Sequence, residues 1–411
     1  MSNCIVAQSG GPTAAINASL CGVIEAALKH PEIDTVYGAL NGITGVLEDH
    51  TLNLTERFAH NPESLQQLSY TPAMYLGSCR FKLPDYSKAA EPYEKIFSFF
   101  KEKSIGYFFY IGGNDSMDTV SKLSKYATEH HIDVKIIGIP KTIDNDLVET
   151  DHTPGFGSAA KYVATTLLEI AHDTYIYDLE SVTIVEIMGR NAGWLTAASA
   201  LARTTYSSAP DLIYLPETAF DVQQFIERIK TLQKSRKNVI VAVSEGIKDK
   251  DGNYVAASVS GTNDAFGHAK LSGVGKTLEY MLADQLGCKV RSVELSVLQR
   301  AAGHIGSNTD IQEAIAVGKA AVESAIKGLT GKMMAIKRIN VKPYEVEIQP
   351  VDVGLVANQE KQVPKHYISA SGDDVTSDFL EYARPLIEGE TPLTYKNGLP
   401  NYMDIQHLKN N

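Results

Sequence analysis

The run PKTIDNDL at residues 140–147 contains the side chains of this sequence that are best suited to catalysis. Asp144 and Asp146 stand two residues apart and follow both a strand-like apolar stretch and a lysine, Lys141. Two such carboxylates can divide their tasks, one lying near a metal ion and the other accepting a proton from a substrate hydroxyl. Phosphoryl transfer needs this combination, because it depends on positioning, on cations beside the phosphate oxygens and on a proton acceptor. A solvated acidic loop is the alternative interpretation of the same run.

Two glycine-rich turns are candidates for binding phosphate groups. SGGPTAAIN at residues 9–17 and GGNDS at residues 112–116 each follow an apolar stretch and lead into a predicted helix. The backbone amides and the dipole at the start of a helix favour anions. A purely structural turn is the alternative for each run, although two such turns in one chain make it less convincing. Asp115 raises a question, because a carboxylate in a phosphate-binding turn repels the phosphate.

Further charged residues follow later strand-like stretches. In EIMGRNAGW, Arg190 stands just after a predicted strand, where its guanidinium could bind a phosphate or pair with a surface carboxylate. In SEGI, Glu245 stands at another strand end, where its carboxylate could accept hydrogen bonds from two sugar hydroxyls. Arg291 and Arg300, nine residues apart in VRSVELSVLQR, could be phosphate ligands or ordinary surface charges.

Strand-like and helix-like segments alternate along the chain, and the polar runs fall where predicted strands end. Strands are predicted at residues 3–8, 106–111, 135–139, 182–188, 238–246 and 291–297. Helices are predicted at about residues 14–29, 116–129 and 157–172, from about residue 192, and from a capping box at Asp310 and Glu313 to about Lys327. This rhythm predicts an α/β protein with parallel sheets between helices and with ligands at the carboxyl ends of the strands. The tail after about Leu355 shows weaker periodicity.

The length and composition limit the possible architecture and partners. A chain of 411 residues predicts two lobes, and 44% hydrophobic with 21% charged residues is ordinary for a globular protein. The net charge of −11 argues against a nucleic acid or an anionic membrane as partner, although a few convergent cations can still bind small anions. No apolar run is long enough to span a membrane, and no signal peptide is visible. The scattered cysteines are interpreted as reduced thiols in the cytoplasm: Cys4, Cys21, Cys79 and Cys288.

The chain resembles the phosphofructokinase family, and within it the pyrophosphate-dependent branch. Seven runs carry the resemblance, in this order: GGPTAAIN, GSCRF, GGNDS, PKTIDND, MGR, SEG and LQR. The resemblance extends over about residues 3–330. It implies two Rossmann-like lobes with parallel-rich sheets flanked by helices, and an active site in the cleft between them. It further implies a larger, donor-binding lobe of residues 1–155 plus 304–354, and a smaller lobe of residues 156–303 plus 355–411 that binds fructose 6-phosphate.

The resemblance also implies roles for individual residues. Asp144 is expected to be the general base for the 1-hydroxyl of fructose 6-phosphate, and Asp146 to assist with metal and charge. Two cations, Arg80 and Lys141, complete the expected catalytic group. The expected donor-binding residues are Gly11, Gly113, Asp115 and Ser116. The expected sugar-phosphate-binding residues are Thr142, Met188, Gly189, Arg190, Glu245, Arg291 and Arg300. Arg291 is expected to reach across from a neighbouring subunit, which implies a homodimer or homotetramer.

Asp115 and Lys141 decide the expected phosphoryl donor. ATP-using members of the family carry glycine at both positions, whereas pyrophosphate-using members carry aspartate and lysine. A carboxylate near the α-phosphate of a nucleotide adds bulk and repulsion, since two unit charges about 4 Å apart repel by roughly 1–4 kcal/mol at dielectrics of 80 to 20. Pyrophosphate has no α-phosphate or ribose to meet that carboxylate. The resemblance therefore predicts a reversible, Mg²⁺-dependent transfer between pyrophosphate and fructose 6-phosphate, in glycolysis and gluconeogenesis.

Three alternative functions are less consistent with these residues. The first is an ATP-dependent 6-phosphofructokinase in which Asp115 swings away from the donor. The second is a relative of the NAD and lipid kinases, which share a Gly-Gly-Asp turn but in which the TIDND and MGR runs together have no counterpart. The third is a regulatory paralogue that binds sugar phosphate without catalysis, and the presence of Asp144 and Asp146 argues against it.

Three departures from the family pattern have consequences for the predicted site. Asn114 stands where most members have an aspartate that helps to bind Mg²⁺, and its amide oxygen is the expected metal ligand here. Ser181 stands where bacterial relatives have a second cross-subunit arginine, so the grip on the 6-phosphate must be rearranged. Cys21 and Glu25 stand where bacterial ATP-using relatives have effector-binding arginines, so regulation at that site is expected to be weak or absent.

Overall fold

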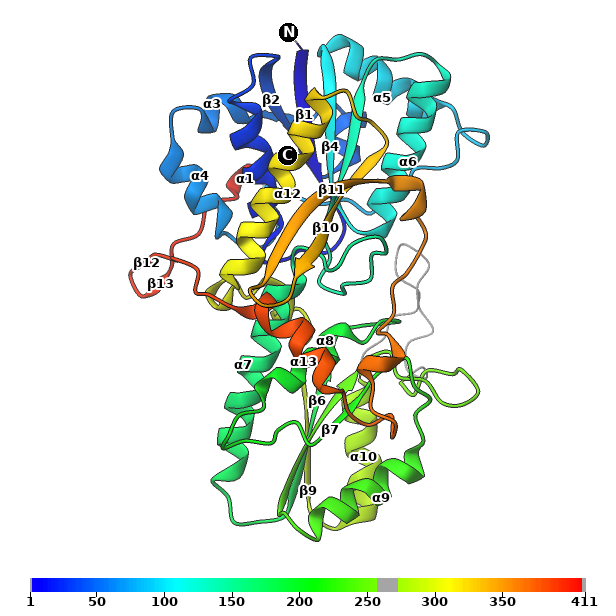
Figure 1. The fold of residues 1–411 in the computed structure, drawn as a ribbon, viewed down its shortest axis with the longest axis vertical. Coiled ribbons are helices and arrows are strands. Elements are labelled where there is room, and N and C mark those ends of the chain that lie inside the picture. The colour runs from blue at the N-terminus through cyan, green and yellow to red at the C-terminus, as the bar shows by residue number, and fades with distance from the viewer. Residues whose placement is uncertain (1, 257–272, 409–411) are drawn as a thin grey trace.

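The computed structural model describes residues 2–256 and 273–408. Two lobes lie one above the other in Figure 1, and each is built on its own β-sheet with helices against both faces. The predicted α/β class with parallel-rich sheets is confirmed.

The larger lobe contains a seven-stranded sheet in the order β11-β10-β5-β4-β1-β2-β3. Its parallel strands are β1 Ser2–Gln8, β2 Ile33–Ala39, β4 Ile105–Gly112, β5 Lys135–Pro140 and β10 Lys332–Asn340. The edge strands β3 Thr51–Asn53 and β11 Glu345–Asp352 pair antiparallel to their neighbours.

Both faces of this sheet are covered by helices. The covering helices are α1 Ile16–Ala27, α12 Asn308–Ile326, α5 Glu91–Glu102 and α6 Asn114–Glu129. Val6 of β1 lies in the core formed with α1 and α12, whereas Ile5 lies in the core formed with α5 and α6. Successive strand residues point to opposite faces, so covering both faces explains why β1 is apolar without alternation.

The smaller lobe contains a four-stranded, fully parallel sheet in the order β7-β8-β6-β9. Its strands are β6 Ser181–Ile187, β7 Leu212–Tyr214, β8 Asn238–Ser244 and β9 Lys289–Glu294. Its helices are α7 Phe156–Tyr175, α8 Trp194–Ala198, α9 Val222–Gln233 and α10 Val274–Leu286. Ile184 of β6 packs with α9 and α10, and Val185 packs with α7 and α8.

Short elements connect these layers. The remaining α-helices are α2 Ile43–Leu47, α3 Leu54–Phe58, α4 Pro62–Ser69, α11 Leu298–Ala301 and α13 Ser377–Ala383. The 3-10 helices are Ser199–Ala202, Gly303–Ile305, Val353–Leu355, Lys365–Tyr367, Arg384–Ile387 and Gln406–Leu408. A hairpin joins β12 Tyr395–Lys396 to β13 Leu399–Pro400.

The start of α12 differs from the sequence prediction. Its N-cap is Ser307, whose Oγ accepts the Asp310 amide at 3.4 Å. The Asp310 carboxylate instead accepts the amides of Gly155 and Ser158 at 2.8 and 2.9 Å, at the start of α7. The predicted capping box at Asp310 and Glu313 is therefore wrong, because both carboxylates point to neighbouring segments rather than back to their own helix.

The predicted strand at residues 291–297 also differs from the structure. The strand ends at Glu294, Ser296 has a φ of +42°, and α11 begins at Leu298. A backbone turn at Ser296 breaks the ladder, which the alternating apolar pattern of this run did not reveal.

The C-terminal segment crosses between the lobes twice. Val356 lies in a core of the larger lobe and Val363 in a core of the smaller lobe. The chain then returns to the larger lobe, where the Met403 amide donates to Thr71 Oγ1 at 2.9 Å and His407 Nε2 lies 2.7 Å from the Tyr75 carbonyl. The predicted assignment of all of residues 355–411 to the smaller lobe differs from these contacts.

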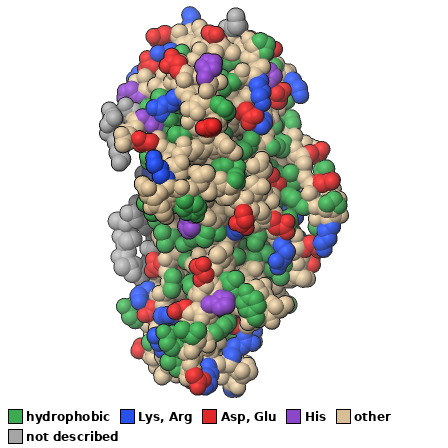
Figure 2. Space-filling model, turned by 90° about the vertical axis from the view of Figure 1, so that its left-hand side faces the viewer, with side chains coloured by type: hydrophobic (Ala, Val, Ile, Leu, Met, Phe, Trp, Pro, Cys, Tyr) green, Lys and Arg blue, Asp and Glu red, His purple; other side chains and the backbone are tan. Residues whose placement is uncertain are grey.

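Charged side chains of both signs are dispersed over the face of the molecule seen in Figure 2. Among the described residues, no helix combines the length and the apolar character needed to cross a bilayer.

Candidate active site

The carboxyl ends of the two parallel sheets face each other across the boundary between the lobes (Figure 1). The turns after β1, β4 and β5 come from the larger lobe, and those after β6 and β8 come from the smaller lobe. Ligands of open α/β sheets bind beyond the carboxyl ends of the strands. The predicted site residues lie mostly on these five turns.

The turn after β5 has a fixed conformation. Asn145 adopts a φ of +54°, its Nδ2 donates to the Tyr382 hydroxyl at 2.9 Å, and its Oδ1 accepts the Thr153 amide at 3.1 Å. Asparagine tolerates this backbone region better than most residues. The Asp144 amide also donates to Thr142 Oγ1 at 3.1 Å. The buried Asn145 therefore anchors the turn that carries the two aspartates.

The two aspartates lie in a buried environment with charges of both signs. Burial raises the pKa of Asp144, the Glu245 carboxylate adds to this, and the Arg190 guanidinium opposes it. Burial and the neighbouring Asp144 raise the pKa of Asp146. Two adjacent carboxylates with raised pKa values are typical of a site that accepts or shares protons near neutral pH.

Lys141 lies beneath the first glycine turn. Its side chain is only 2% exposed, and its ammonium donates to the Gly11 carbonyl at 2.7 Å. A Cβ on Gly10, which has a φ of +80°, would lie 3.2 Å from that ammonium. Burial lowers the pKa of Lys141 to about 7, although the Asp144 charge raises it. An anion bound above Gly11 would favour the charged ammonium.

Two arginines add positive charge around the same turn. An Arg300 nitrogen lies 3.6 Å from the position that a Cβ on Gly11 would occupy. Burial lowers the pKa of Arg300, the Asp144 charge raises it, and the positive charge of Arg80 lowers it again. Arg80 and Lys141, expected at the donor, and Arg300, expected at the sugar phosphate, therefore concentrate cations around the first glycine turn.

The second glycine turn, after β4, leads directly into α6. Gly113 precedes the helix, and a Cβ on Gly112 would lie 1.9 Å from Ser116 Oγ, so only glycine fits beside this serine. Asp115 is in the first helical turn, and its carboxylate lies 3.6 Å from the Lys82 ammonium with both side chains about half exposed. Asp115 thus stands at the edge of the turn, with part of its charge offset by Lys82.

The turn after β6, which is predicted to bind the sugar, is held from two sides. The Gly189 amide donates to Glu245 Oε1, and the Met188 amide donates to the buried Gln299, each at 3.3 Å. A Cβ on Gly246 would lie 1.7 Å from the Arg190 carbonyl, so the glycine of the SEG run allows the two turns to meet. Burial raises the pKa of Glu245 to about 7, and the Gly189 amide opposes it.

Asn114 has a different environment from the one predicted. Its Oδ1 accepts the Asn358 amide at 2.6 Å, and its Nδ2 donates to the Gln359 carbonyl. Both polar ends of the side chain are therefore bonded to backbone, and these bonds compete with the predicted role as metal ligand.

A cation such as Mg²⁺ has other ligands available at this site. Among the described residues, no three His, Cys, Asp or Glu side chains form a ready metal cluster. Asp146 Oδ1, however, is buried without a hydrogen-bond partner. Mg²⁺ is usually bound through one or two carboxylates together with substrate phosphates, so one free carboxylate oxygen beside a phosphate site fits it.

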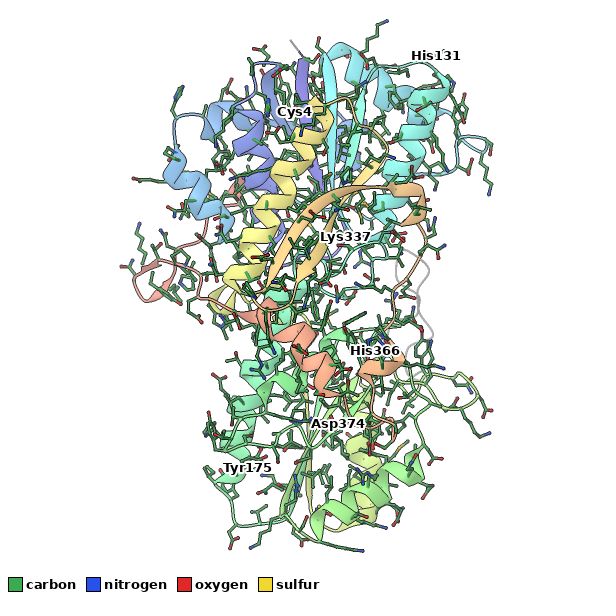
Figure 3. The ribbon with its side chains drawn as sticks, viewed as in Figure 1. Cys4, His131, Tyr175, Lys337, His366 and Asp374 are labelled. Carbon is green, nitrogen blue, oxygen red and sulfur yellow. The ribbon has the colours of Figure 1, made fainter. Side chains whose placement is uncertain are left out.

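Arg291 lies apart from the other predicted site residues. Its guanidinium bonds Thr183, Asp173 and Thr174 at 3.0, 2.9 and 2.7 Å, near the end of α7. Figure 3 shows Tyr175, the last residue of α7, in the half of the smaller lobe that is farther from the larger lobe. Arg291 therefore does not reach the site of its own chain.

The other residues that depart from the family pattern, Ser181, Cys21 and Glu25, make ordinary structural contacts. Ser181 Oγ accepts the Asn238 side-chain amide at 2.9 Å at the start of β6. Cys21 is buried in α1, and Glu25 pairs with Lys29 and Lys319 at 2.9 and 3.0 Å. The Glu25 carboxylate is thus engaged by two lysines of the larger lobe.

The structure adds residues that the sequence did not single out. Glu217 Oε1 accepts the amides of Gly193 and Val363, and Lys361 donates its amide to the Asp146 carbonyl. Gln299 lies within the quoted LQR run, but neither Glu217 nor Lys361 belongs to a recognisable motif. Their contacts are made with backbone groups, which leave no pattern in the sequence.

Comparisons with known proteins show what the chain is similar to. The profile of the family described as phosphofructokinase matches residues 3–325. The chain is 42% identical to a pyrophosphate–fructose 6-phosphate 1-phosphotransferase of Methylococcus capsulatus, with 98% of this chain and 96% of that protein covered. It is also 42% identical to one of Halomonas elongata, with 97% and 94% covered. The crystal structure of a pyrophosphate-dependent phosphofructokinase from Marinobacter aquaeolei matches with a TM-score of 0.87 at 40% identity, covering 98% of this chain and 95% of that one.

Proposed function

The chain belongs to the phosphofructokinase family, and we propose that it transfers a phosphoryl group from pyrophosphate to the 1-hydroxyl of fructose 6-phosphate. The products are fructose 1,6-bisphosphate and orthophosphate, a step of glycolysis. Asp115 and Lys141 beside the phosphate-binding turns carry the donor assignment, and relatives similar over nearly the full chain are named for this reaction.

Asp144 acts as the general base in this proposal. It accepts the proton of the 1-hydroxyl while that oxygen attacks the nearer phosphorus of pyrophosphate, and the bond from this phosphorus to the bridging oxygen breaks as orthophosphate leaves. A base is most effective when its pKa lies close to the working pH, and burial moves the pKa of Asp144 in that direction. Arg190 and Glu245 bind the sugar beside it, together with Thr142, Met188, Gly189 and Arg300.

The donor is held by cations and backbone amides of the larger lobe. Lys141 and Arg80 balance the negative charge of the phosphates, and the turns at Gly11 and Gly113 present amides at strand ends. Ser116 lies buried in the first turn of α6, directly beside Gly112. Such fixed charges lower the barrier because they do not need to reorganise as the phosphoryl group moves.

Phosphotransferases of this family generally depend on a divalent metal ion, and Mg²⁺ is the ion that we propose. Asp146 is the proposed protein ligand, because its buried Oδ1 lacks a partner. Bound there, Mg²⁺ supplies positive charge to the phosphate oxygens. Asn114 is not needed as a ligand in this arrangement, since its amide bonds the backbone at residues 358 and 359.

We further propose that the protein is a homo-oligomer in which Arg291 binds the 6-phosphate in the site of a neighbouring subunit. Tyr177 and Leu179 lie beside Arg291 with exposed side chains. Tyr175 and Ile176, which precede them in the chain, are exposed as well. Ile176 is 73% exposed and Tyr177 50% exposed. An exposed patch of large apolar residues is typical of an interface between protein chains.

The transfer is proposed to be reversible and cytoplasmic. Pyrophosphate and the product phosphate ester have bonds of comparable energy, so the same site can run the reaction in the direction of gluconeogenesis. The four cysteines are free thiols, which fits a reducing compartment.

Phosphorus NMR of a mixture of protein, pyrophosphate, fructose 6-phosphate and Mg²⁺ tests the proposed function. We expect orthophosphate and fructose 1,6-bisphosphate to appear in equal amounts, and the reverse reaction to form pyrophosphate from these two products. Hydrolysis of pyrophosphate without a bisphosphate product, or no reaction with this sugar, would contradict the proposal. Adding ATP in a parallel sample tests the second candidate, the ATP-dependent reaction, in which the half-exposed Asp115 would have to swing aside.

A further inference from the structure

A short segment of chain crosses from the larger to the smaller lobe directly beside the proposed active site. We call residues 356–363 the strap. In Figure 1 it is the orange segment that descends from the 3-10 helix after β11 into the smaller lobe, and His366 of Figure 3 lies just beyond it. Val356 at one end and Val363 at the other are buried in the cores of different lobes. Both ends of the strap are therefore fixed.

The strap first contacts the donor turn. Asn358, with a φ of +61°, donates its amide to Asn114 Oδ1 at 2.6 Å, and the Gln359 carbonyl accepts from Asn114 Nδ2. Asn358 Nδ2 also donates to Asp118 Oδ1 at 3.0 Å on the next turn of α6. The bonds to the Asn358 amide and to the Gln359 carbonyl require that residue 114 has both an acceptor and a donor on its side chain. Asparagine provides both, whereas an ionised aspartate only accepts.

The strap next contacts the turn that carries the two aspartates. The Lys361 amide donates to the Asp146 carbonyl at 2.7 Å, and the Lys361 ammonium donates to the carbonyls of Thr150 and Asp151 at 3.1 and 2.9 Å. The same ammonium lies 5.0 Å from the centre of the Trp194 ring, a distance at which a cation is attracted to an aromatic face. Lys361 thus fixes both ends of the segment from Asp146 to Asp151.

Finally the strap contacts the sugar-binding side. The Lys361 carbonyl accepts Trp194 Nε1 at 2.9 Å, at the start of α8. Glu217 Oε1 accepts the amides of Gly193 and Val363, both at 2.8 Å, and so joins the end of the MGRNAG run to the strap. One continuous segment therefore bonds the donor turn, the catalytic turn and the sugar-binding turn.

We propose that the strap aligns the donor half of the active site with the sugar half, and that Asn114 and Lys361 are positioning residues for the transfer. The proposal depends on the proposed function for the identity of the two halves. It also explains why Asn114 is not an aspartate, since a carboxylate there would face the Gln359 carbonyl without a hydrogen between them. The family profile ends at residue 325, so the strap lies outside the part of the chain that it matches.

The strap can affect the reaction because the two reactants are bound by different lobes in the proposed function. The attacking oxygen and the phosphorus must be brought into line, and a misplacement of about 1 Å can slow an enzyme about 100-fold. Separate lobes move relative to each other unless their contact is large and apolar. A segment that is anchored in both cores and bonded to all three turns limits that motion where it affects the reaction.

Four variants test the proposal. Lys361→Met removes the ammonium but keeps an unbranched side chain, and Asn114→Asp replaces the donor to the Gln359 carbonyl with a charged oxygen. Lys361→Arg is the conservative replacement, and Lys365→Met is the matched control, because Lys365 is an exposed lysine just beyond the strap. We expect kcat to fall about 10–100-fold in Lys361→Met and Asn114→Asp with little change in KM for either substrate. Lys361→Arg should recover part of the loss, and Lys365→Met should match the unmodified protein.

Hydrogen exchange provides a second readout that does not depend on activity. Loss of the strap contacts should speed exchange at residues 113–118 in Asn114→Asp and at residues 146–151 in Lys361→Met, while β1 and β6 stay protected. If the unmodified protein does not react with pyrophosphate and fructose 6-phosphate, the proposed function fails, and the exchange data alone judge the strap. Unchanged exchange in both variants, with kcat equal to that of Lys365→Met where activity is measurable, would overturn the proposal. If Lys361→Met does not fold, Asn114→Asp decides, because Asn114 is only partly buried.

Discussion

At the level of single residues, the proposed chemistry depends on one carboxylate among charges of both signs. Burial and Glu245 raise the pKa of Asp144, whereas Arg190 and Lys141 lower it. The opposing effects keep this carboxyl group able to exchange a proton near neutral pH. Asp146, two residues away, is free to bind a metal ion because its Oδ1 has no hydrogen-bond partner.

Replacing the proposed base should slow the reaction strongly while fructose 6-phosphate still binds. In Asp144→Ala we expect kcat to fall about 10²–10⁴-fold, which is the usual contribution of a general base. The dissociation constant of fructose 6-phosphate, measured by calorimetry, should change only slightly, because Arg190, Glu245 and Arg300 are intact. A variant with nearly normal turnover would exclude Asp144 as the base.

Asp115 is the residue that should discriminate between donors. In Asp115→Gly we expect ATP to bind more tightly as a competitive inhibitor against pyrophosphate. Since Lys82 lies 3.6 Å from the Asp115 carboxylate and offsets part of its charge, the gain should be at the lower end of the expected repulsion, about tenfold. Asp133→Gly is the control, because it removes another exposed aspartate of the same lobe that pairs with a lysine. Equal inhibition constants in all three proteins would contradict the role of Asp115.

At the level of elements, a buried polar network lies behind the catalytic turn. His152 lies between Asp151 at 2.8 Å and Glu313 of α12 at 2.6 Å, and the Tyr344 hydroxyl donates to the other Glu313 oxygen at 2.6 Å. Arg338 of β10 bonds Asp151 as well. Burial opposes the charged imidazole, but the Glu313 and Asp151 charges prevail and raise the pKa of His152 to about 9. The network therefore ties the catalytic turn to α12 and β10.

This network predicts a dependence of stability on pH. Because the folded-state pKa of His152 lies above its unfolded value, its contribution is complete below about pH 6.5 and is lost as the pH rises through about 9. A rise of that size corresponds to on the order of 3 kcal/mol of unfolding free energy. The difference in unfolding free energy between the unmodified protein and His152→Gln should shrink between pH 6 and pH 9.5. A difference that stays constant over this range would contradict a charged His152.

The helices and strands show which parts of the fold could be predicted from the sequence. Buried strands such as β1, β4, β6 and β8 were predicted nearly to their ends, since parallel strands covered on both faces read as continuous apolar runs. The turns after these strands carry the motifs from which the site residues are predicted. Strands such as β2, β7 and β10 and helices such as α9 and α10 were not predicted, because they carry no motif and their patterns are interrupted by polar residues.

The contacts made by irregular chain could not be predicted. The carboxylates of Asp310 and Glu313 suggest a cap by spacing alone, but tertiary partners at α7 and His152 take them instead. The strap is neither helix nor strand, and most of its contacts involve a backbone amide or carbonyl, which leaves no pattern in the sequence. Only the folded structure shows that Lys361 meets Asp146 and Trp194.

At the level of the whole molecule, the proposed homo-oligomer requires a second copy of the chain to complete the active site. Arg291 bonds residues near the end of α7, away from Asp144, and lies beside the exposed apolar residues of that end. Oligomers of identical chains are usually closed and symmetric, so each subunit would give its Arg291 to the site of another.

Mixing two inactive variants tests this shared site. In a dimer of one Asp144→Ala subunit and one Arg291→Ala subunit, one site has lost both residues and the other keeps both. Random reassembly of equal amounts should therefore restore about a quarter of the activity of the unmodified protein, measured as turnover after dissociation and reassociation. Mixtures that stay as inactive as the separate variants would show that Arg291 does not act across the interface.

The central claim is that an aspartate and a lysine at the donor turns select pyrophosphate and exclude ATP. The most direct test is the ratio of kcat/KM for pyrophosphate to kcat/KM for ATP, measured at fixed fructose 6-phosphate and Mg²⁺. The charge on Asp115, partly offset by Lys82, predicts a preference for pyrophosphate of at least about tenfold. Turnover with ATP that matches turnover with pyrophosphate would contradict the claim.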